Sequence, residues 1–563
     1  MGRRAVYQMK KRIKRWSILG SVIIFFSSGC QAEEANEIEP DPIKKQPENV
    51  YEHEGLQRYE EPITLTMVGE MSENLRGLEE QFPGETLRDN RWTALYNDVL
   101  GIEIHYDWIV ESPFFTQRLA NEIAFGNLPD VLKVDAVQMR QLAKAGLIQD
   151  LTDVFETYAT SFTKRVMSQE SIDPFEAARI DGKLMGIPEV ISDLDTMQYI
   201  WIRTDWLKNV ELDPPKTMDD LLVISKAFTH HDPDQNGKDD TYGLAVTNYL
   251  WNNIGGITGF MAGFQAYPTI WLETDEGELV YGGIQPEVKE ALRVLQDMYQ
   301  DGQIDSEFMF KDGNKIKEQV ANGEIGLLFG EQWASFWVED SLKQDPNADW
   351  QAFPIVSATE QSPKMPISHQ VDYFWVVRTD YEYPEALLKL INLHLEKNWG
   401  ETAEYERYYS TPFPAWQFSP ITPYPVLKNL EAYRDLEEAR QTGDTSKLKG
   451  EAKAINDRIY EYQHEGEQTG WGWLKTYGTD GAYSILNQFL KNDQILFDKF
   501  TSPPTETMIE MDTILMNRQL DYYQNIILGN PISDFDSFVH DWKEVGGNVM
   551  TEEINDHYRK HQP

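Results

Sequence analysis

Hydrophobic positions along the chain alternate between two spacings, which predict strands separated by helices. Alternating, β-branched runs predict strands at residues 63–68, 102–106 and 130–134. Helical spacing predicts helices at 92–100 and 114–125. Because strand and helix succeed one another at these lengths, the pattern favours βαβ units and a mainly parallel sheet.

The same pattern continues through the middle of the chain and then changes. The spacing predicts further elements: strands at 198–203, 243–246, 325–329 and 373–377, and amphipathic helices at 217–228 and 286–301. After about Pro420 the pattern is mostly helical, with aromatic-rich loops. We therefore expect an α/β protein whose C-terminal part is largely helical.

The N-terminus has the pattern of a secretory signal peptide, which we assign to residues 1–29. Seven Lys and Arg residues precede an apolar run at 18–26 that is too short to span a bilayer. The sequence Ser27-Ser28-Gly29-Cys30 follows, and a small-small-Cys ending resembles the bacterial lipobox, whose Cys is lipidated; Ser27 replaces the usual Leu. The alternative is an ordinary signal with an incidental Cys. We favour lipidation of Cys30, because it is the only Cys of the chain.

Composition limits the partners and the chemistry. The chain of 563 residues has 93 acidic and 51 basic side chains and a formal net charge of −42, which argues against nucleic acid as a partner. One Cys excludes internal disulfides and Cys-based metal sites. Residues 30–61 are rich in Glu, Pro, Asn and Lys and lack an apolar pattern. They predict a flexible acidic tether between a membrane anchor and a globular body.

Several segments together resemble one family. They lie at 126–131, 145–152, 182–188, 202–207 and 214–220. In this order they are similar to the extracellular solute-binding proteins (family 1) of bacterial carbohydrate ABC transporters, in the large lipoprotein branch of Gram-positive bacteria. The resemblance implies a two-lobed periplasmic-binding-protein-like fold with hinge strands. It also implies a sugar bound in the cleft between the lobes, with lobe closure on binding.

The resemblance suggests how the mature chain is divided. We expect the first part of lobe 1 at 62–188 and the first part of lobe 2 at 189–364. Residues 365–425 would return to lobe 1 and include the hinge, and residues 426–563 would form the helical C-terminal part that completes lobe 2.

One Asp-rich loop has the spacing of a calcium site. Counting from Asp232, side-chain oxygens fall at positions 1, 3, 5 and 9, a glycine stands at position 6 and a backbone carbonyl at position 7. Position 12 is Gly243 rather than the bidentate Glu, so the loop is a variant. The resemblance adds that such loops bind calcium in some members. The alternative is an Asx turn with solvated charge. The candidate ligands of a structural calcium ion are Asp232, Asp234, Asn236, Lys238, Asp240 and Thr241.

The abundance of aromatic residues, 12% of the chain, suits a sugar site. Sugar rings stack on aromatic planes, and their hydroxyls need carboxylates, amides and Arg. Our candidates lie at predicted strand ends, on one face of the strands at 198–203 and 373–377, near a probable crossing between the lobes, or in loops, of which the one around Gly472 is expected to be a glycine-rich turn. They are Glu70, Asp135, Glu189, Tyr199, Trp201, Arg203, Trp251, Asn252, Glu331, Trp333, Tyr373, Trp375, Trp471 and Trp473. For any single Trp the alternative is core packing, to which we assign Trp206 and Trp542.

These observations lead to one functional hypothesis and two alternatives. We expect a non-enzymatic, monomeric substrate-binding lipoprotein on the extracellular face of the cell membrane. It would capture an oligosaccharide and deliver it to ABC transporter permease subunits. A cell-surface glycan hydrolase or lyase could use the same aromatic, acidic cleft, since it needs only two carboxylates flanking a sugar bond. A peptide-binding lipoprotein is a third possibility.

Overall fold

The strands expected near the start of the chain build one edge of the first sheet. The computed structural model describes residues 51–169, 173–368, 371–410, 413–466 and 468–561. In it, β1 (Ile63–Met71) pairs in parallel with β2 (Ile102–Glu111). Leu65 and Met67 are buried on one side of β1, as the alternation predicts. The Asp130 carboxylate, just before β3 (Val131–Asp135), accepts a 2.9 Å hydrogen bond from the Thr66 amide of β1.

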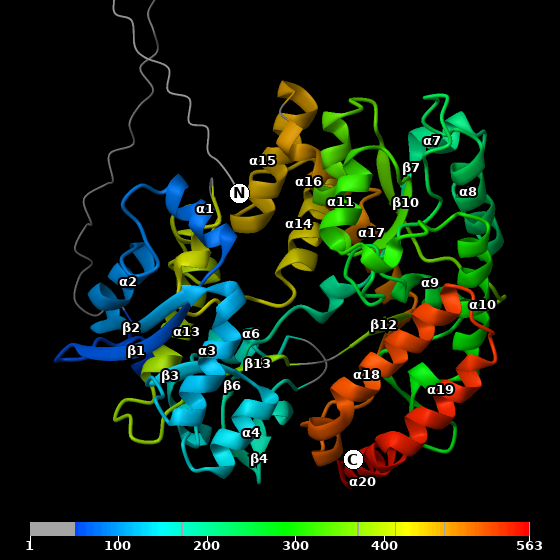
Figure 1. Ribbon diagram of the computed structural model, residues 1–563. Helices are drawn as coiled ribbons and strands as arrows, with labels where there is room; N and C mark the ends of the chain where they lie inside the picture. Colours follow the sequence, from blue (N-terminus) through cyan, green and yellow to red (C-terminus); the bar gives the residue numbers. More distant parts are fainter. Residues whose placement is uncertain (1–50, 170–172, 369–370, 411–412, 467, 562–563) are drawn as a thin grey trace, which may run out of the picture. The chain divides into compact units, whose positions relative to one another are not determined.

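The buried apolar side chains form two separate cores, and we name the elements around them the first and second lobes (Figure 1). The first-lobe core draws its buried residues from 56–187 and 374–421. Besides β1, β2 and β3, its elements are α1 (Glu73–Gln81), α2 (Arg91–Leu95), α3 (Ser112–Phe125), α4 (Ala136–Lys144), α5 (Thr152–Tyr158), α6 (Ser161–Val166), β4 (Arg179–Ile180), β5 (Lys183–Leu184), β6 (Ile187–Pro188), β13 (Tyr373–Val377) and α13 (Ala386–Trp399).

The second-lobe core draws its buried residues from 194–367 and 430–554. Its elements before the return to the first lobe are β7 (Tyr199–Arg203), α7 (Thr204–Asn209), α8 (Met218–His230), α9 (Thr258–Gly263), β8 (Trp271–Glu273), β9 (Leu279–Tyr281), α10 (Pro286–Gln300), α11 (Gly313–Ala321), β10 (Leu327–Gly330), α12 (Ser335–Val338), β11 (Trp350–Phe353) and β12 (Met365–Ile367). Those after it are α14 (Lys428–Thr442), α15 (Gly450–Glu465), α16 (Trp471–Tyr477), α17 (Ala482–Lys491), β14 (Ile495–Phe497), α18 (Glu506–Ile527), α19 (Asp534–Trp542) and α20 (Asn548–His561).

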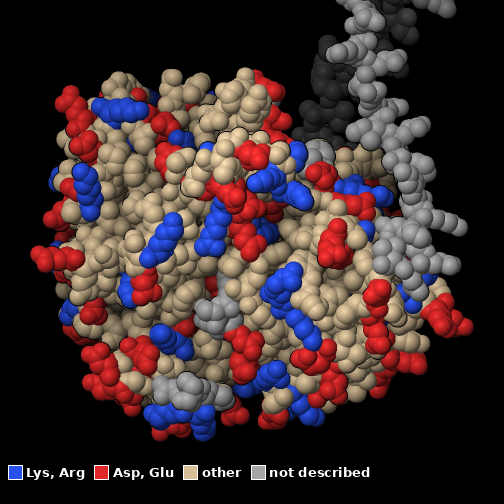
Figure 2. Space-filling model, turned by 180° about the vertical axis from the view of Figure 1, so that it is seen from behind, with Lys and Arg blue, Asp and Glu red and all other residues tan. Residues whose placement is uncertain are grey.

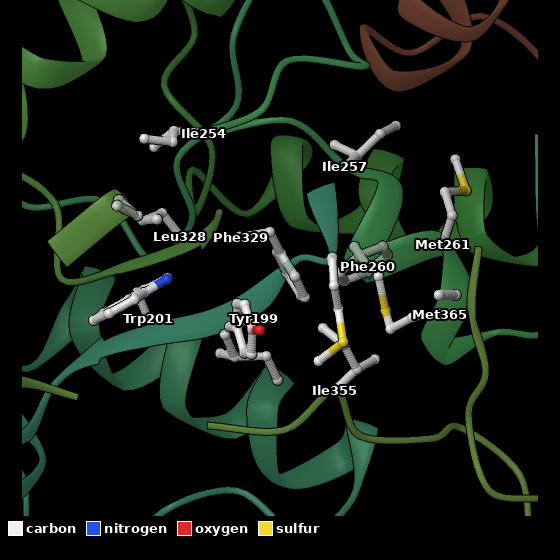
Figure 3. Packing of buried hydrophobic residues seen from close by; sticks show 14 of the residues in the cluster. Tyr199, Trp201, Ile254, Ile257, Phe260, Met261, Leu328, Phe329, Ile355 and Met365 are labelled. Carbon is white, nitrogen blue, oxygen red and sulfur yellow. The ribbon is translucent and has the colours of Figure 1, made fainter. Parts of the chain in front are cut away.

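Local sequence explains where the amphipathic helices of the second lobe begin. Thr217 caps α8 by accepting a hydrogen bond from the Asp220 amide, and the Asp220 carboxylate accepts one from the Thr217 amide in return. Pro286 starts α10, where its missing N–H costs nothing. Around β7, side chains from β10 and α9 such as Phe329 and Phe260 close the core (Figure 3). The predicted amphipathic faces are therefore the buried faces.

The chain passes between the two cores three times. The crossings lie between residues 187 and 194, 367 and 374, and 421 and 430. The first crossing contains a short 3-10 helix, η4 (Asp193–Thr196). The lobe boundaries expected from the sequence, after residues 188, 364 and 425, stay a prediction beside these crossings. All described residues belong to one unit, residues 47–563.

The expectation of a mainly parallel sheet is wrong. β1 and β2 are parallel, but β13 runs antiparallel to both β3 and β6. In the second lobe, β7 is flanked by antiparallel β10 and β11. Successive strands pair in parallel only when the chain returns directly through a helix. Here the partners of β3 and β7 come from segments far along the chain, so local alternation could not predict their direction.

Two expected elements differ from prediction. The helix at 92–100 is divided: α2 ends at Leu95, and a π-helical turn (Tyr96–Leu100) follows, which Gly101 terminates with φ +70°. The expected strand at 243–246 is buried but forms no ladder. Its Leu244 amide donates to Gln303 and its Ala245 amide donates to Leu327. Successive backbone amides of this segment donate to two different neighbouring segments. Their hydrogen-bonding capacity is therefore satisfied, but no continuous ladder with one partner strand forms.

The tether expected at residues 30–61 ends earlier than predicted. Residues 30–50 lie outside the described part, but residues 51–61 pack on the first lobe. Leu56 is buried, and the ammonium group of Lys389 in α13 donates to the carbonyls of Glu54 and Gln57 at 2.7 and 2.8 Å. Backbone carbonyls in a polar stretch carry no signature in the sequence, which explains the error.

The surface of the described residues carries mixed charge. On the face seen in Figure 2, Lys and Arg side chains are interspersed with Asp and Glu rather than gathered in a basic stripe. Within the described ranges, the helices fall short of the length and apolar character needed to cross a membrane.

Candidate functional site

Three predicted residues, Asp135, Glu189 and Glu70, gather around a fourth, Tyr373, where the chain enters β13. Tyr373 pairs in register with Asp135 at the end of β3, and its carbonyl accepts a 2.9 Å hydrogen bond from the Glu189 amide. Its ring is 46% exposed, and Lys133 Nζ lies 4.5 Å from the ring centroid. Lys133 also forms an ion pair with Glu189. The structure therefore brings an open aromatic ring and several carboxylates to the place where two crossings leave the first lobe.

Electrostatics confirms that these carboxylates share one neighbourhood. Partial burial raises the pKa of Tyr373, and the negative charges of Asp372, Asp135, Glu189 and Glu70 raise it further. Glu70 itself is exposed on β1. Asp135 also caps α4, by accepting a 2.7 Å hydrogen bond from the Gln138 amide. A ring of acceptors around an aromatic plane suits a ligand that carries many hydroxyl groups.

The short helix η4 connects this group to a second group of acids. The carboxylate of Asp193 is an electrostatic neighbour of Asp372, and burial together with Asp193 and Glu189 raises the pKa of Asp372. Two residues along, Asp195 accepts hydrogen bonds from Tyr483 (2.6 Å) and Asn429 (2.7 Å). Burial raises the pKa of Asp195 despite these donors. At the first crossing, Asp193 therefore lies near an acid of the first lobe, and Asp195 is hydrogen-bonded to helices of the second lobe.

In the second lobe, Glu331 and Trp333 follow β10 as expected. Glu331 is buried, and Trp333 donates its Nε1–H to the Glu331 carboxylate. Burial raises the pKa of Glu331 to about 7, and the charge of Asp195 contributes to this rise. Trp333 is half-buried and meets Trp337 edge-on, with ring centroids 5.8 Å apart. The hydrogen bond therefore fixes the orientation of the Trp333 indole.

Three candidates on β7 are buried in the core instead of lining a surface. Trp201 is fully buried and donates its Nε1–H to the carbonyls of Gly330 and Glu331 (Figure 3). Arg203 is 2% exposed and pairs with Asp205 and Asp345. Tyr199 is fully buried, and its hydroxyl lacks a hydrogen-bond partner among the described residues. A central strand buries both faces, so alternation along it does not distinguish site from core.

The remaining aromatic candidates are spread over both lobes. Trp375 is buried beside Glu189 in a small cavity near the first and third crossings. Trp251 is half-buried against Tyr523, and the Asn252 carbonyl accepts from the Gln198 side chain. Among the described residues, no ring contact or side-chain hydrogen bond links Trp375 or Trp251 to Tyr373.

Trp471 and Trp473 begin helix α16 rather than flanking a turn, which corrects the expected glycine-rich turn. Gly472 between them lies so close to the Phe336 ring that a Cβ atom would stand 2.6 Å from it. Close packing, not turn geometry, therefore explains this glycine. Trp471 is buried, whereas Trp473 is half-buried between Phe336 and Arg458.

Trp206 and Trp542 are both buried, so their assignment to the core is confirmed. Sequence reasoning missed Lys133, Asp372, Asp195 and Tyr483. Lys133 lies two residues before the candidate Asp135, and Asp372 directly precedes the candidate Tyr373. Their charge near a strand end was the sequence signal that could have identified them. Asp195 and Tyr483 are 288 residues apart, so only the folded chain brings them together.

The Asp-rich loop folds back on itself in the manner its spacing predicts. The Gly237 amide, at φ +76°, donates to both carboxylate oxygens of Asp232 at 3.2 and 3.1 Å. The Asn236 amide group donates to Asp234 and Asp240. Burial raises the pKa of Asp234, and the carboxylates of Asp232 and Asp240 add to the rise. Hydrogen bonds among these residues therefore hold the loop together.

Two observations limit this loop as a metal site. The Thr241 hydroxyl is buried and donates to the Phe228 carbonyl of α8 at 2.7 Å, so it is engaged away from the carboxylates. In the described part of the chain, no three His, Cys, Asp or Glu side chains form a group that could hold a metal ion. An ion in this loop would depend also on the Asn236 side-chain oxygen and the Lys238 carbonyl.

Comparison with known proteins identifies the family of the chain. Lipoprotein LipO of Bacillus subtilis (strain 168) is 23% identical over 465 residues, which are 82% of this chain and 87% of LipO. The polygalacturonan/rhamnogalacturonan-binding protein YtcQ of the same organism is 29% identical over 231 residues, 40% of this chain and 44% of YtcQ.

The fold is shared with a solved structure. The Streptococcus pneumoniae ABC-transporter substrate-binding protein FusA, in complex with kestose, superposes with a TM-score of 0.58 at 17% identity. The alignment covers 89% of this chain and 99% of that one, and it confirms the expected two-lobed α/β fold. The profile of the bacterial extracellular solute-binding proteins matches residues 85–398, more than half of the chain. The chain therefore belongs to the bacterial extracellular solute-binding protein family.

Proposed function

We propose that this protein is the substrate-binding lipoprotein of an ABC importer and that it captures an oligosaccharide between its lobes. The exposed Tyr373 ring among carboxylates, at the crossings between the lobes, is the observation that carries the proposal. An aromatic plane offers stacking area to a sugar ring, and the carboxylates accept hydrogen bonds from its hydroxyls. The names of YtcQ and FusA, which are a polysaccharide-binding and a fructooligosaccharide transport protein, support a glycan ligand.

Closure of the lobes would complete the site and signal to the permease. Trp333 and Glu331 of the second lobe would then meet the ligand from the side opposite Tyr373. Hinge closure around a ligand is a recurring motion of such binding proteins. The protein acts as a monomer, binds without chemical conversion, and presents its closed form to the permease subunits.

Binding is tested by calorimetry with the purified full-length chain and a panel of oligosaccharides. We expect one class to bind with one site per chain and without product after prolonged incubation. Trp333→Ala should weaken that binding about tenfold or more. The variant loses the apolar area that the indole buries against the ligand, and it also loses the stacking, which is worth roughly 1 kcal/mol beyond that area. Phe125→Ala, at an exposed Phe of α3, is the matched control. Product formation would favour the hydrolase or lyase alternative, and binding of peptides alone would favour the peptide-binding one.

We further propose that the chain is anchored by a lipid on Cys30, which lies outside the described residues. The lipobox-like ending and the name of lipoprotein LipO support this. Mass spectrometry of the N-terminal peptide should find a diacylglyceryl-modified Cys30. Cys30→Ala should release the protein from the membrane fraction, whereas retention there would contradict the anchor.

A calcium ion in the Asp-rich loop is also a proposal. Asp232, Asp234, Asp240, the Asn236 side-chain oxygen and the Lys238 carbonyl would hold it. The spacing of the loop and the hydrogen bonds from Asn236 to Asp234 and Asp240 support this proposal, since calcium prefers six to eight oxygen ligands. When bound, the ion would neutralise the carboxylates and fix the loop that follows α8, with no part in ligand chemistry.

A further inference from the structure

The aromatic plane at the entrance of β13 is surrounded by more carboxylates than cations. Asp372 precedes Tyr373 in the chain, Asp135 pairs with it in register, and the Glu189 amide donates to its carbonyl at 2.9 Å. The charges of these acids and of Glu70 all raise the pKa of Tyr373. The cation that the described structure places among them is Lys133, and its charge is already matched by Glu189. An approaching anion would therefore meet uncompensated negative charge on this side of the site.

Neighbouring cations do not change this balance. Arg76, near the ends of β1 and β2, forms an ion pair with Glu111. The internal residues outside the described ranges (170–172, 369–370, 411–412 and 467) include neither Lys nor Arg. The first-lobe side of the site therefore has hydrogen-bond acceptors in excess.

The second-lobe side has the same character. Glu331 is buried and Asp195 is half-buried, and the charge of Asp195 acts on the Glu331 carboxylate. Lys428 lies near Asp195, but its ammonium group pairs with Glu451 at 3.3 Å. The negative charges of Asp195 and Glu331 also act on the buried Tyr199 hydroxyl, for which the described residues supply no hydrogen-bond partner.

We propose that the ligand of this site is an uncharged oligosaccharide, and that the carboxylates reject glycans containing uronate or sulfate groups. This inference rests on the proposed function and specifies its substrate class. Hydroxyl groups of a neutral sugar donate to carboxylates. A carboxylate on the ligand would instead face these acids and the already paired Lys133, and Coulomb repulsion would weaken its binding. The chain would thus differ in ligand charge from a relative named for polygalacturonan binding.

The test compares neutral and acidic tetrasaccharides by calorimetry on the full-length chain. The panel contains gluco-, galacto-, xylo-, manno- and fructo-tetrasaccharides beside tetragalacturonate and tetramannuronate. At 20 mM salt we expect the best neutral ligand to bind at least about tenfold more tightly than either uronide. The gap should narrow at 0.5 M salt, because salt screens exposed charges.

Charge-removing variants separate electrostatics from shape. Asp372→Asn and Glu70→Gln should each raise uronide affinity relative to neutral affinity by about threefold or more, while Glu276→Gln in an exposed turn should leave the ratio unchanged. Tighter binding of a uronide than of every neutral sugar would overturn the inference and leave the proposed function standing. Absence of binding by both kinds of glycan would overturn the proposed function, and this inference with it.

Discussion

The hydroxyl of Tyr483 in α17 donates a 2.6 Å hydrogen bond to the carboxylate of Asp195 in η4. This bond ties the helical C-terminal part of the chain to the first crossing between the lobes. Tyr483 is fully buried and Asp195 is half-buried, so the bond is largely shielded from bulk water. The position of the crossing therefore depends on a helix almost three hundred residues away.

Removing the donor should destabilise the fold. Tyr483→Phe keeps the ring and leaves Asp195 with one hydrogen bond fewer, which we expect to lower the free energy of unfolding by about 1–3 kcal/mol. Urea unfolding followed by fluorescence measures the change. Tyr460→Phe, at a Tyr that is 53% exposed, is the matched control and should alter stability by less than about 0.5 kcal/mol. Equal stability of the two variants would contradict the structural role of the bond.

Glu331 should make stability depend on pH. Burial raises the pKa of Glu331 from 4.5 to about 7 in the folded state, so the folded protein binds this proton more tightly than the unfolded chain does. Proton binding by Glu331 therefore stabilises the fold fully below pH 4.5, and this contribution is lost as the pH rises toward 7. The free energy of unfolding should fall by up to about 3 kcal/mol over this range.

The Glu331→Gln variant isolates this contribution, because Gln keeps an oxygen for Trp333 and does not titrate. We expect the difference in unfolding free energy, variant minus wild type, to increase between pH 4.5 and 7.5. Glu276→Gln, at an exposed carboxyl, should show a flat difference. A flat difference for Glu331→Gln as well would mean that the carboxyl titrates normally.

Arg203 should act in stability rather than in ligand binding. Its guanidinium is 2% exposed and pairs with Asp205 at 2.6 Å and Asp345 at 2.8 Å. Arg203→Ala leaves these acids without their partner and should cost about 3 kcal/mol of unfolding free energy. Arg293→Ala, which breaks exposed pairs on α10, should cost less than about 1 kcal/mol. Ligand affinity of the folded Arg203→Ala protein should equal that of wild type; lost affinity at normal stability would restore Arg203 as a ligand contact.

The Asp-rich loop provides a test by metal removal. If calcium occupies it at 100 times the dissociation constant, the native state gains about 2.7 kcal/mol, and a chelator should lower the melting temperature by several degrees. Asp234→Asn should remove this chelator effect. Asp275→Asn, in an exposed turn between β8 and β9, should retain it. The same melting temperature of wild type with calcium and with chelator would show that the loop is held by its own hydrogen bonds.

The sequence by itself determined the elements, the family and part of the site. The spacing at 286–301 predicts α10 to within one residue, because helix formation and burial of one face depend on local order. Asp135 was predicted from a strand end, Glu189 from a probable crossing and Tyr373 from a strand face, and the three residues lie together. Charge and aromatic character at the end of a strand are visible without a structure.

Only the tertiary structure decided which candidates are core and how distant segments meet. Trp201 and Trp333 are both tryptophans that the sequence offers as site candidates. The first lies on β7, which is flanked by β10 and β11, and is fully buried, whereas the second is half-buried after the end of β10. Asp195 joins the first crossing to the C-terminal helices because it accepts hydrogen bonds from Tyr483 of α17 and Asn429 of α14. Periodicity reports which face of an element is buried, whereas the partners that cover the face are set by long-range packing, and no local pattern records them.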